Sequence, residues 1–282
     1  MKKPPQGPHL YTDIGLKIRA LLYTDYPPTP KFSITASRLH GQESLTFVGT
    51  KKDDSLYAVV RTGSENYNTV TYARVDTNPT SITTTTYNEI NVAPGLKAVL
   101  GFTYQNSYKV GLKYKHNYGG ITTAVRFMEN PCVDFSGVIG TNFLSLGTDV
   151  TFNTTTKSFS KYNFGCSTSI NNFIFSMNLN DKCDLLKASY YEILSPSTKT
   201  AVGVEVSHIF STHLCSSVLG AQLELNPLTT VKTRLGLSKF SALIQREILP
   251  MTRVTVYGEF DIKNIRKWPK FGMALDLKFD MN

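Results

Sequence analysis

Segments of about ten residues, in which apolar and polar side chains alternate, follow one another from residue 31 to the end of the chain. Gly, Pro, Asn, Asp and Ser residues separate these segments. Because successive side chains of a strand point to opposite faces, each segment is predicted to be an amphipathic β-strand. Gly95–Tyr104 and Lys109–Tyr118 alternate most clearly, whereas Asn68–Asp76 and Phe240–Leu249 have mixed faces. The pattern predicts about 19 strands.

The number and the uniform length of the segments favour a transmembrane β-barrel. An open sheet rarely exceeds about ten strands, and a tilted strand crosses a bilayer with about 9–11 residues. Small and basic residues share the polar face, as Gly111 and Lys113 do. A soluble all-β binding module has the same period with its faces inverted and stays the alternative. The sequence has no run that approaches the roughly 18 apolar residues of a membrane-spanning helix.

A convincing helical period appears only between Leu10 and Tyr26. Its apolar residues share one face, and these are Leu10, Tyr11, Ile14, Ile18, Leu21 and Leu22. Prolines that begin at Pro27 are expected to end this helix. No later composition shift divides the chain. We therefore expect an N-terminal tail and helix over residues 1–30 and a single β domain over residues 31–282.

Charge and motifs restrict the classes of function. The net charge of +9 and a pI of about 9.2 favour anionic partners such as phosphates and metabolite anions. Nucleic acid is not expected as the primary ligand, because no run of Lys or Arg exceeds two residues. We find no nucleophile elbow, P-loop or HExxH motif, and no Cys and His at metal-ligand spacing. An enzyme, a metal site and a cofactor are therefore not expected.

Short segments spread over nearly the whole chain resemble the plant-type voltage-dependent anion channel, a mitochondrial outer-membrane porin of the eukaryotic porin family. In chain order they are Leu10-Tyr11-Thr12-Asp13-Ile14-Gly15, Gly95-Leu96-Lys97, Phe135-Ser136-Gly137-Val138, Leu144-Ser145-Leu146-Gly147-Thr148-Asp149-Val150, Ala188-Ser189-Tyr190-Tyr191, Ser195-Pro196-Ser197-Thr198, Pro227-Leu228-Thr229-Thr230-Val231-Lys232 and Ala242-Leu243-Ile244-Gln245. Each is weak alone, but their order and spacing make the resemblance specific. The sequence departs from the family pattern in the helix, at Leu16, Ile18 and Ala20, and in the prolines that follow it.

The resemblance implies a barrel of about 19 strands with the amphipathic helix inside its lumen. It implies a voltage-dependent, weakly anion-selective channel that passes metabolites and small ions (ATP, ADP, phosphate and chloride) across the mitochondrial outer membrane. The partners are then the lipid bilayer and the transported anionic metabolites and nucleotides, with homo-oligomers and cytosolic kinases as further partners of the family. A protein-import barrel of the same superfamily is an alternative that the plant porin segments disfavour.

Three groups of residues are candidates for roles in such a channel. The pore helix contributes Asp13, Lys17 and Arg19. The polar faces of the strands contribute a lumen path for anions, namely Lys97, Lys113, Lys115, Arg126, Lys232 and Arg234. In the last strand Lys270, Gly272, Leu275 and Leu277 resemble the insertion signal of mitochondrial outer-membrane barrels. For any single lysine an ordinary solvated surface charge is the alternative, and for the last strand it is a routine amphipathic strand.

Overall fold

A single sheet forms the whole wall of the molecule. The computed structural model describes residues 10–26, 32–40, 43–52, 55–66, 69–78, 81–103, 107–141, 143–264, 266 and 268–280. In this part of the chain 19 strands belong to one sheet. They are β1 (Phe32–His40), β2 (Glu43–Lys52), β3 (Ser55–Asn66), β4 (Thr69–Asn78), β5 (Ser81–Ala93), β6 (Leu96–Thr103), β7 (Ser107–His116), β8 (Gly119–Phe127), β9 (Cys132–Gly140), β10 (Leu144–Asn153), β11 (Ser158–Ile170), β12 (Phe173–Asn180), β13 (Leu185–Ser195), β14 (Thr200–Ile209), β15 (Leu214–Asn226), β16 (Thr229–Gly236), β17 (Lys239–Leu249), β18 (Thr252–Asp261) and β19 (Lys270–Asp280).

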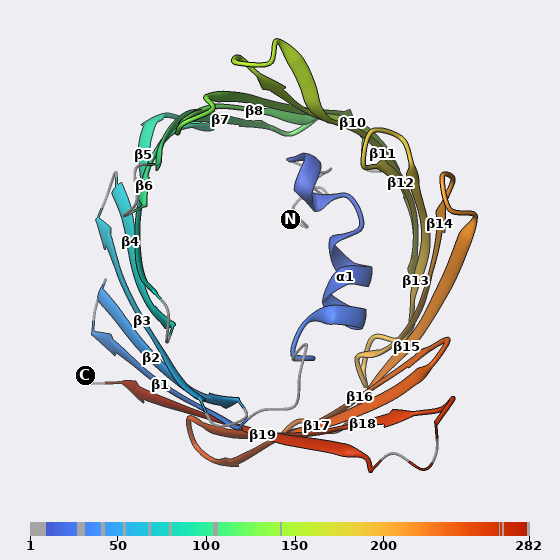
Figure 1. Cartoon of the computed structure of the whole chain (residues 1–282). Coiled ribbons are helices and arrows are strands. Elements are labelled where there is room, and N and C mark those ends of the chain that lie inside the picture. The colour runs from blue at the N-terminus through green and yellow to red at the C-terminus, as the bar shows by residue number, and fades with distance from the viewer. Residues whose placement is uncertain are drawn as a thin grey trace, which may run out of the picture.

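The sheet closes into a barrel through its first and last strands (Figure 1). Strands that follow one another in the sequence pair antiparallel, whereas β1 and β19 pair parallel, from Phe32 opposite Met273 to Leu39 opposite Asp280. The parallel pair follows from the odd number of strands, because the first and last strands of an up-and-down meander then run in the same direction. The 19 strands predicted from alternation are confirmed, including the two with mixed faces, which are β4 and β17.

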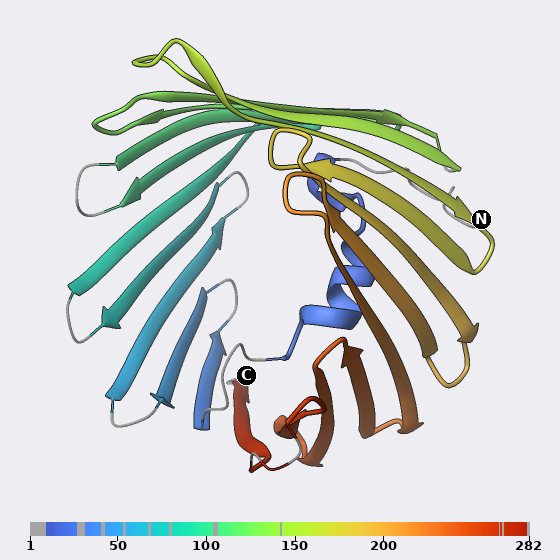
Figure 2. The same cartoon turned by 45° about the vertical axis from the view of Figure 1, so that its right-hand side comes forward.

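The strands run at a tilt around the barrel (Figure 2). The outer surface of the barrel is apolar. On β7 the outward side chains Tyr108, Val110, Leu112 and Tyr114 are 44–52% exposed. A dry core like that of a soluble sandwich would bury such residues, so the apolar face points outward, to lipid. Among the described residues, no helix has the length and apolar character needed to cross a membrane. The division into residues 1–30 and 31–282 stays a prediction.

The N-terminal helical segment lies inside the barrel, and it is broken (Figure 1). A 3₁₀ turn, η1 (Tyr11–Asp13), precedes the helix α1 (Leu16–Tyr23). The predicted continuous helix from Leu10 to Tyr26 is therefore wrong, because Gly15 between the two pieces has φ +69°, in the left-handed region. The predicted apolar face is nevertheless the buried one, since Ile14, Ile18, Leu21 and Leu22 are at most 3% exposed.

Candidate functional site in the lumen

The helical segment rests on glycines of the lumen wall. These are Gly147 of β10, Gly165 of β11, Gly203 of β14 and Gly220 of β15. A methyl group on Gly203 would overlap Cδ1 of Ile18, and one on Gly220 would overlap Cδ2 of Leu22. The absence of side chains at these positions lets α1 lie directly on the backbone of the wall, which narrows the lumen on that side.

Two cations of β16 hold the C-terminal end of α1. Lys232 Nζ lies 2.8 Å from Asp25 Oδ2, and Arg234 donates to the Leu22 carbonyl oxygen at 3.3 Å. The Arg234 guanidinium also lies 4.6 Å from the centre of the Tyr26 ring. Positive charge at this end complements the helix dipole. Lys232 and Arg234, predicted as parts of the anion path, are therefore on the lumen face but engaged with the helix.

A buried carboxylate of β14 also holds α1 against the wall. Glu205 of β14 is 6% exposed and accepts a hydrogen bond of 2.7 Å from the Tyr23 hydroxyl. Lys187 of β13 lies 3.4 Å from the same carboxylate. Burial and the hydrogen bond to Glu205 raise the pKa of Tyr23 well above its usual value of 10.0. The hydroxyl therefore remains a donor at neutral pH.

The segment that follows α1 is held by an aromatic cluster. Tyr26, Leu243 of β17 and Tyr257 of β18 are buried together. The Tyr257 ring covers Gly272 of β19 so closely that a methyl group there would overlap it. Gly272 thus has a packing reason to be glycine, apart from any role in insertion. Of the other residues of that motif, Lys270 is on the lumen face opposite Glu259, and Leu275 and Leu277 are on the outer face.

The wall of β5 to β9 carries ion pairs between neighbouring strands. Glu89 accepts from Lys113 at 2.5 Å and from Lys97 at 3.4 Å. Arg126 meets Asp134 through two contacts of 2.7 Å, and Thr151 also donates to Asp134.

Sequence reasoning missed these carboxylates, although alternation could have found Asp134. Asp134 lies in β9 on the same face as Ser136 and Val138, two positions from Ser136.

Other predicted cations of the lumen face water. Lys17 and Lys115 are exposed, and no ion pair joins either to another described residue. Arg19 is exposed as well and donates to the Thr12 carbonyl oxygen. Asp13 accepts from the Leu10 N–H at 3.0 Å, which stabilises the turn at the start of the segment.

One contact on the outer face brings together a histidine and a cysteine that are not at metal-ligand spacing in the sequence. His208 of β14 faces Cys215 of β15, with Nδ1 3.0 Å from Sγ. The described residues nevertheless contain no group of three or more metal-ligating side chains placed to hold an ion.

Comparison with known proteins agrees with this architecture. Residues 7–272 match the eukaryotic porin family. The mitochondrial outer membrane protein porin of 34 kDa from Solanum tuberosum is 48% identical over 97% of this chain and 99% of its own. Porin 1 of the Arabidopsis thaliana mitochondrial outer membrane and the outer plastidial membrane protein porin of Pisum sativum are each 46% identical over the same shares. The predicted family and the predicted outer-membrane porin are thereby confirmed: the chain belongs to the eukaryotic porin family, whose members are channels and not enzymes.

Proposed function

We propose that the protein is a voltage-dependent, weakly anion-selective channel that passes ATP, ADP, phosphate and chloride across the mitochondrial outer membrane. Barrels of about 16–18 strands already leave an aqueous channel, and this wall has 19. The observation that carries the anion preference is the set of exposed cations in the lumen, Lys17, Arg19 and Lys115, beside wall cations such as Arg126 and Lys232 that have carboxylate partners.

The anion path that we propose is narrower than the sequence predicted. Lys97, Lys113, Arg126 and Lys232 each have a carboxylate within 3.4 Å. The pairs of Arg126 and Lys232 are neutral, whereas Glu89 is shared by Lys97 and Lys113, so that group keeps one positive charge. At about 0.15 M salt, charges act over only about 8 Å. The exposed cations of the helix and of β7 therefore contribute most of the field that a permeating anion experiences.

A reversal potential in a potassium chloride gradient tests this proposal. Purified protein in a planar bilayer should prefer chloride modestly, and less so at high salt. The double variant Lys17→Glu with Lys115→Glu should shift the reversal potential toward the cation value. Lys17→Arg with Lys115→Arg, which keeps both charges, is the matched control and should leave it unchanged. An unchanged reversal potential in the glutamate variant would show that Lys17 and Lys115 do not line the conduction path.

The last strand is proposed to contain the insertion signal Lys270, Gly272, Leu275 and Leu277. Leu277→Gln should slow insertion into isolated mitochondria more than Leu223→Gln, a similar outward change on β15. Equal rates would leave ordinary amphipathic packing as the role of the motif. Gly272→Ala is unsuitable here, because the overlap with Tyr257 would affect folding itself.

Homo-oligomers and cytosolic kinases are proposed partners on the basis of family resemblance. Chemical crosslinking in mitochondria tests the first, and co-sedimentation of a kinase with proteoliposomes tests the second.

A further inference from the structure

A carboxylate lies on the lipid-facing side of β13, where conduction does not use it. Tyr191 packs inward against the buried cluster of the helix. Its neighbours Tyr190 and Glu192 therefore point outward, because side chains alternate along a strand. Across the sheet Glu192 stands opposite Phe173 and Val202. Both are apolar, and Phe173 is the first residue of β12, so Glu192 lies on the outer face near this end of the strands.

A group of this kind is costly unless it has a partner. Ionisable side chains of membrane proteins rarely face the lipid, so a lipid-facing carboxylate suggests a functional site. The Tyr190 hydroxyl donates to Glu192 Oε2 at 2.7 Å. For the other carboxylate oxygen, no donor is found among the described residues. A carboxylate accepts hydrogen bonds at both oxygens, so this site calls for a donor from outside the chain.

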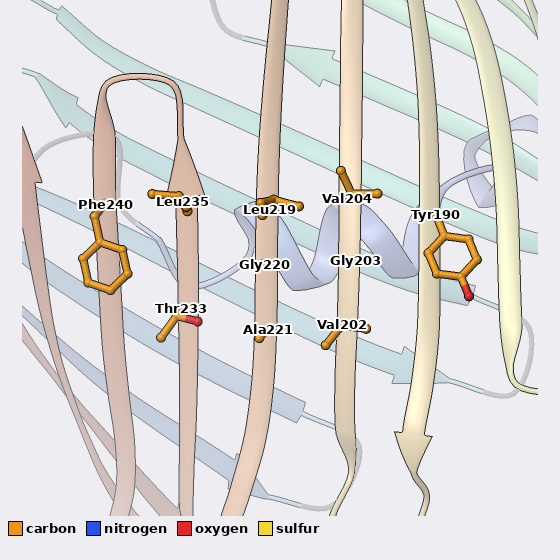
Figure 3. Close-up of a pocket in the computed structure, with 10 residues that line it drawn as sticks. All are labelled: Tyr190, Val202, Gly203, Val204, Leu219, Gly220, Ala221, Thr233, Leu235 and Phe240. Carbon is orange, nitrogen blue, oxygen red and sulfur yellow. The ribbon is translucent and has the colours of Figure 1, made fainter. Parts of the chain in front are cut away.

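An apolar groove begins beside Tyr190 on the same outer face (Figure 3). It is lined by Tyr190, Val202, Val204, Leu219, Ala221, Thr233, Leu235 and Phe240, with Gly203 and Gly220 in its floor. Figure 3 shows Tyr190 at one end of the groove, Phe240 at the other and α1 behind the two glycines. The backbone of β14 and β15 alone separates the groove from Ile18 and Leu22 at these points. The groove therefore backs directly onto the seat of the helix.

The size of the groove selects the kind of occupant. Its volume is about 360 Å³, in the range of about 300–1,000 Å³ typical of small-molecule sites. Two turns of a helix about 10 Å across would displace roughly twice the volume of the groove. The body of a single lipid fits better than a transmembrane helix of a partner protein or the wall of a second barrel.

We propose that Glu192, Tyr190 and this groove bind a membrane lipid that carries a hydroxyl group on an otherwise apolar body. The hydroxyl donates to the free oxygen of Glu192, and the body fills the groove between Tyr190 and Phe240. The proposal rests on the membrane barrel and is independent of ion selectivity.

A pair of probes that differ in one donor tests the site. The protein is placed in lipid nanodiscs with a long-chain alcohol that bears a photoreactive diazirine, or with the methyl ether of the same alcohol. After irradiation, mass spectrometry maps labelled peptides of β14 and β15. Hydrogen bonds to charged groups contribute about 1.5–3 kcal/mol. We therefore expect the alcohol to label the groove about tenfold more than the ether.

Three variants separate the parts of the site. Glu192→Leu should label equally with both probes, because it removes the acceptor and keeps the groove. Ala221→Phe should reduce labelling by both probes, because it fills the groove. Tyr190→Phe should retain the preference for the alcohol, because it removes only the internal donor.

Conductance in planar bilayers should stay unchanged in Glu192→Leu, which shows that the barrel has folded. Equal labelling of the wild type by alcohol and ether would overturn the proposal. So would a preference that persists in Glu192→Leu. Crosslinks between two protein chains at Glu192, without a preference for the alcohol, would indicate a second copy and would also overturn it.

Discussion

Two parts of the lumen wall carry different kinds of side chain, and only one of them lies beneath the helical segment. The helix wall, the lumen face of β10 to β16, presents glycine and serine beneath the helical segment, as at Gly203, Gly220 and Ser176. The charged wall, the lumen face of β5 to β9, presents ion pairs such as Lys113 with Glu89 and Arg126 with Asp134. The difference shows that contact with the helix, more than membership of the lumen, decides which side chains a strand can carry.

Desolvation explains the contrast. A charge covered by α1 would lose its hydration, which costs free energy unless the helix supplies a partner. Beneath the segment Ser176 and Ser189 satisfy each other at 2.7 Å. Where the helix wall does carry a buried charge, the N-terminal segment supplies its partner. Tyr23 donates a hydrogen bond to Glu205, and Asp25 forms an ion pair with Lys232.

The largest expected effect comes from filling the seat of the helix. Gly203→Val with Gly220→Val places side chains where Ile18 and Leu22 now lie. Overpacking typically costs about 1–3 kcal/mol per site, so the seated state should lose about 2–6 kcal/mol. Hydrogen–deuterium exchange of the α1 amides, measured in nanodiscs, should accelerate at least about 30-fold, since about 2 kcal/mol corresponds to that factor.

Gly236→Val is the matched control for this change. Gly236 is also a lumen-facing glycine, but an added Cβ would meet only the Lys239 carbonyl oxygen, at an ordinary 3.7 Å. Exchange of the α1 amides should stay at the wild-type rate in this variant. Equal acceleration in both variants would mean that the glycines act through the strands and not through the helix seat.

Removing the carboxylate partner of a lysine on each wall should give a smaller and asymmetric effect. Asp25→Asn leaves the Lys232 ammonium only 10% exposed and without its partner. Glu89→Gln leaves Lys113 and Lys97, which are 23% and 36% exposed and can be hydrated. We expect Asp25→Asn to weaken the helix seat by about 1–2 kcal/mol, within the cost of leaving a partly buried group unpaired.

Exchange of the α1 amides and ion selectivity together distinguish these two variants. Asp25→Asn should speed exchange about tenfold, whereas Glu89→Gln should leave exchange unchanged and increase the anion preference. Faster α1 exchange in Glu89→Gln would contradict the division into two walls.

Sequence reasoning recovered the wall of the barrel better than its interior. Alternation gave the faces correctly, for instance Leu112 outward and Lys113 inward, because burial on one side fixes the register of a strand. It predicted Lys232 as a lumen cation but not its carboxylate partner, because Asp25 is distant from Lys232 in the sequence. The break at Gly15 was missed as well, since a 3.6-residue period continues across one left-handed residue.

The hydrogen bond at Tyr23 should contribute less than the ion pair at Asp25. Tyr23→Phe removes a donor to Glu205 but leaves Lys187 beside the carboxylate. Because Tyr23 is 41% exposed, we expect a loss of about 1 kcal/mol, which corresponds to about fivefold faster exchange of the α1 amides.

The pH dependence of this bond has a definite sign. The pKa of Tyr23 is raised above 10.0 in the folded protein, chiefly by burial. Because folding raises this pKa, the stability that protonated Tyr23 contributes is complete at a pH below the pKa of tyrosine in the unfolded chain. This stability is lost as the pH rises through the pKa of Tyr23 in the folded protein. Protection of the α1 amides, corrected for intrinsic exchange, should therefore be constant between pH 7 and pH 9. A decline within that window would contradict the assignment of Tyr23 as a protonated donor.

The smallest expected effect tests whether the pairs of the charged wall are truly neutral toward ions. Exchanging the two ends of one pair, Arg126→Asp with Asp134→Arg, preserves its net charge and its place on β8 and β9. Since the two groups meet within 2.7 Å, an ion more than about 8 Å away experiences little change. The reversal potential should therefore match the wild type, whereas Arg126→Gln alone leaves Asp134 uncompensated and should shift it toward cations. If the exchanged pair shifts the potential as far as Arg126→Gln does, permeating ions approach within a few ångströms of this wall. The ion pairs of the charged wall, and not the exposed cations Lys17 and Lys115, would then set the selectivity.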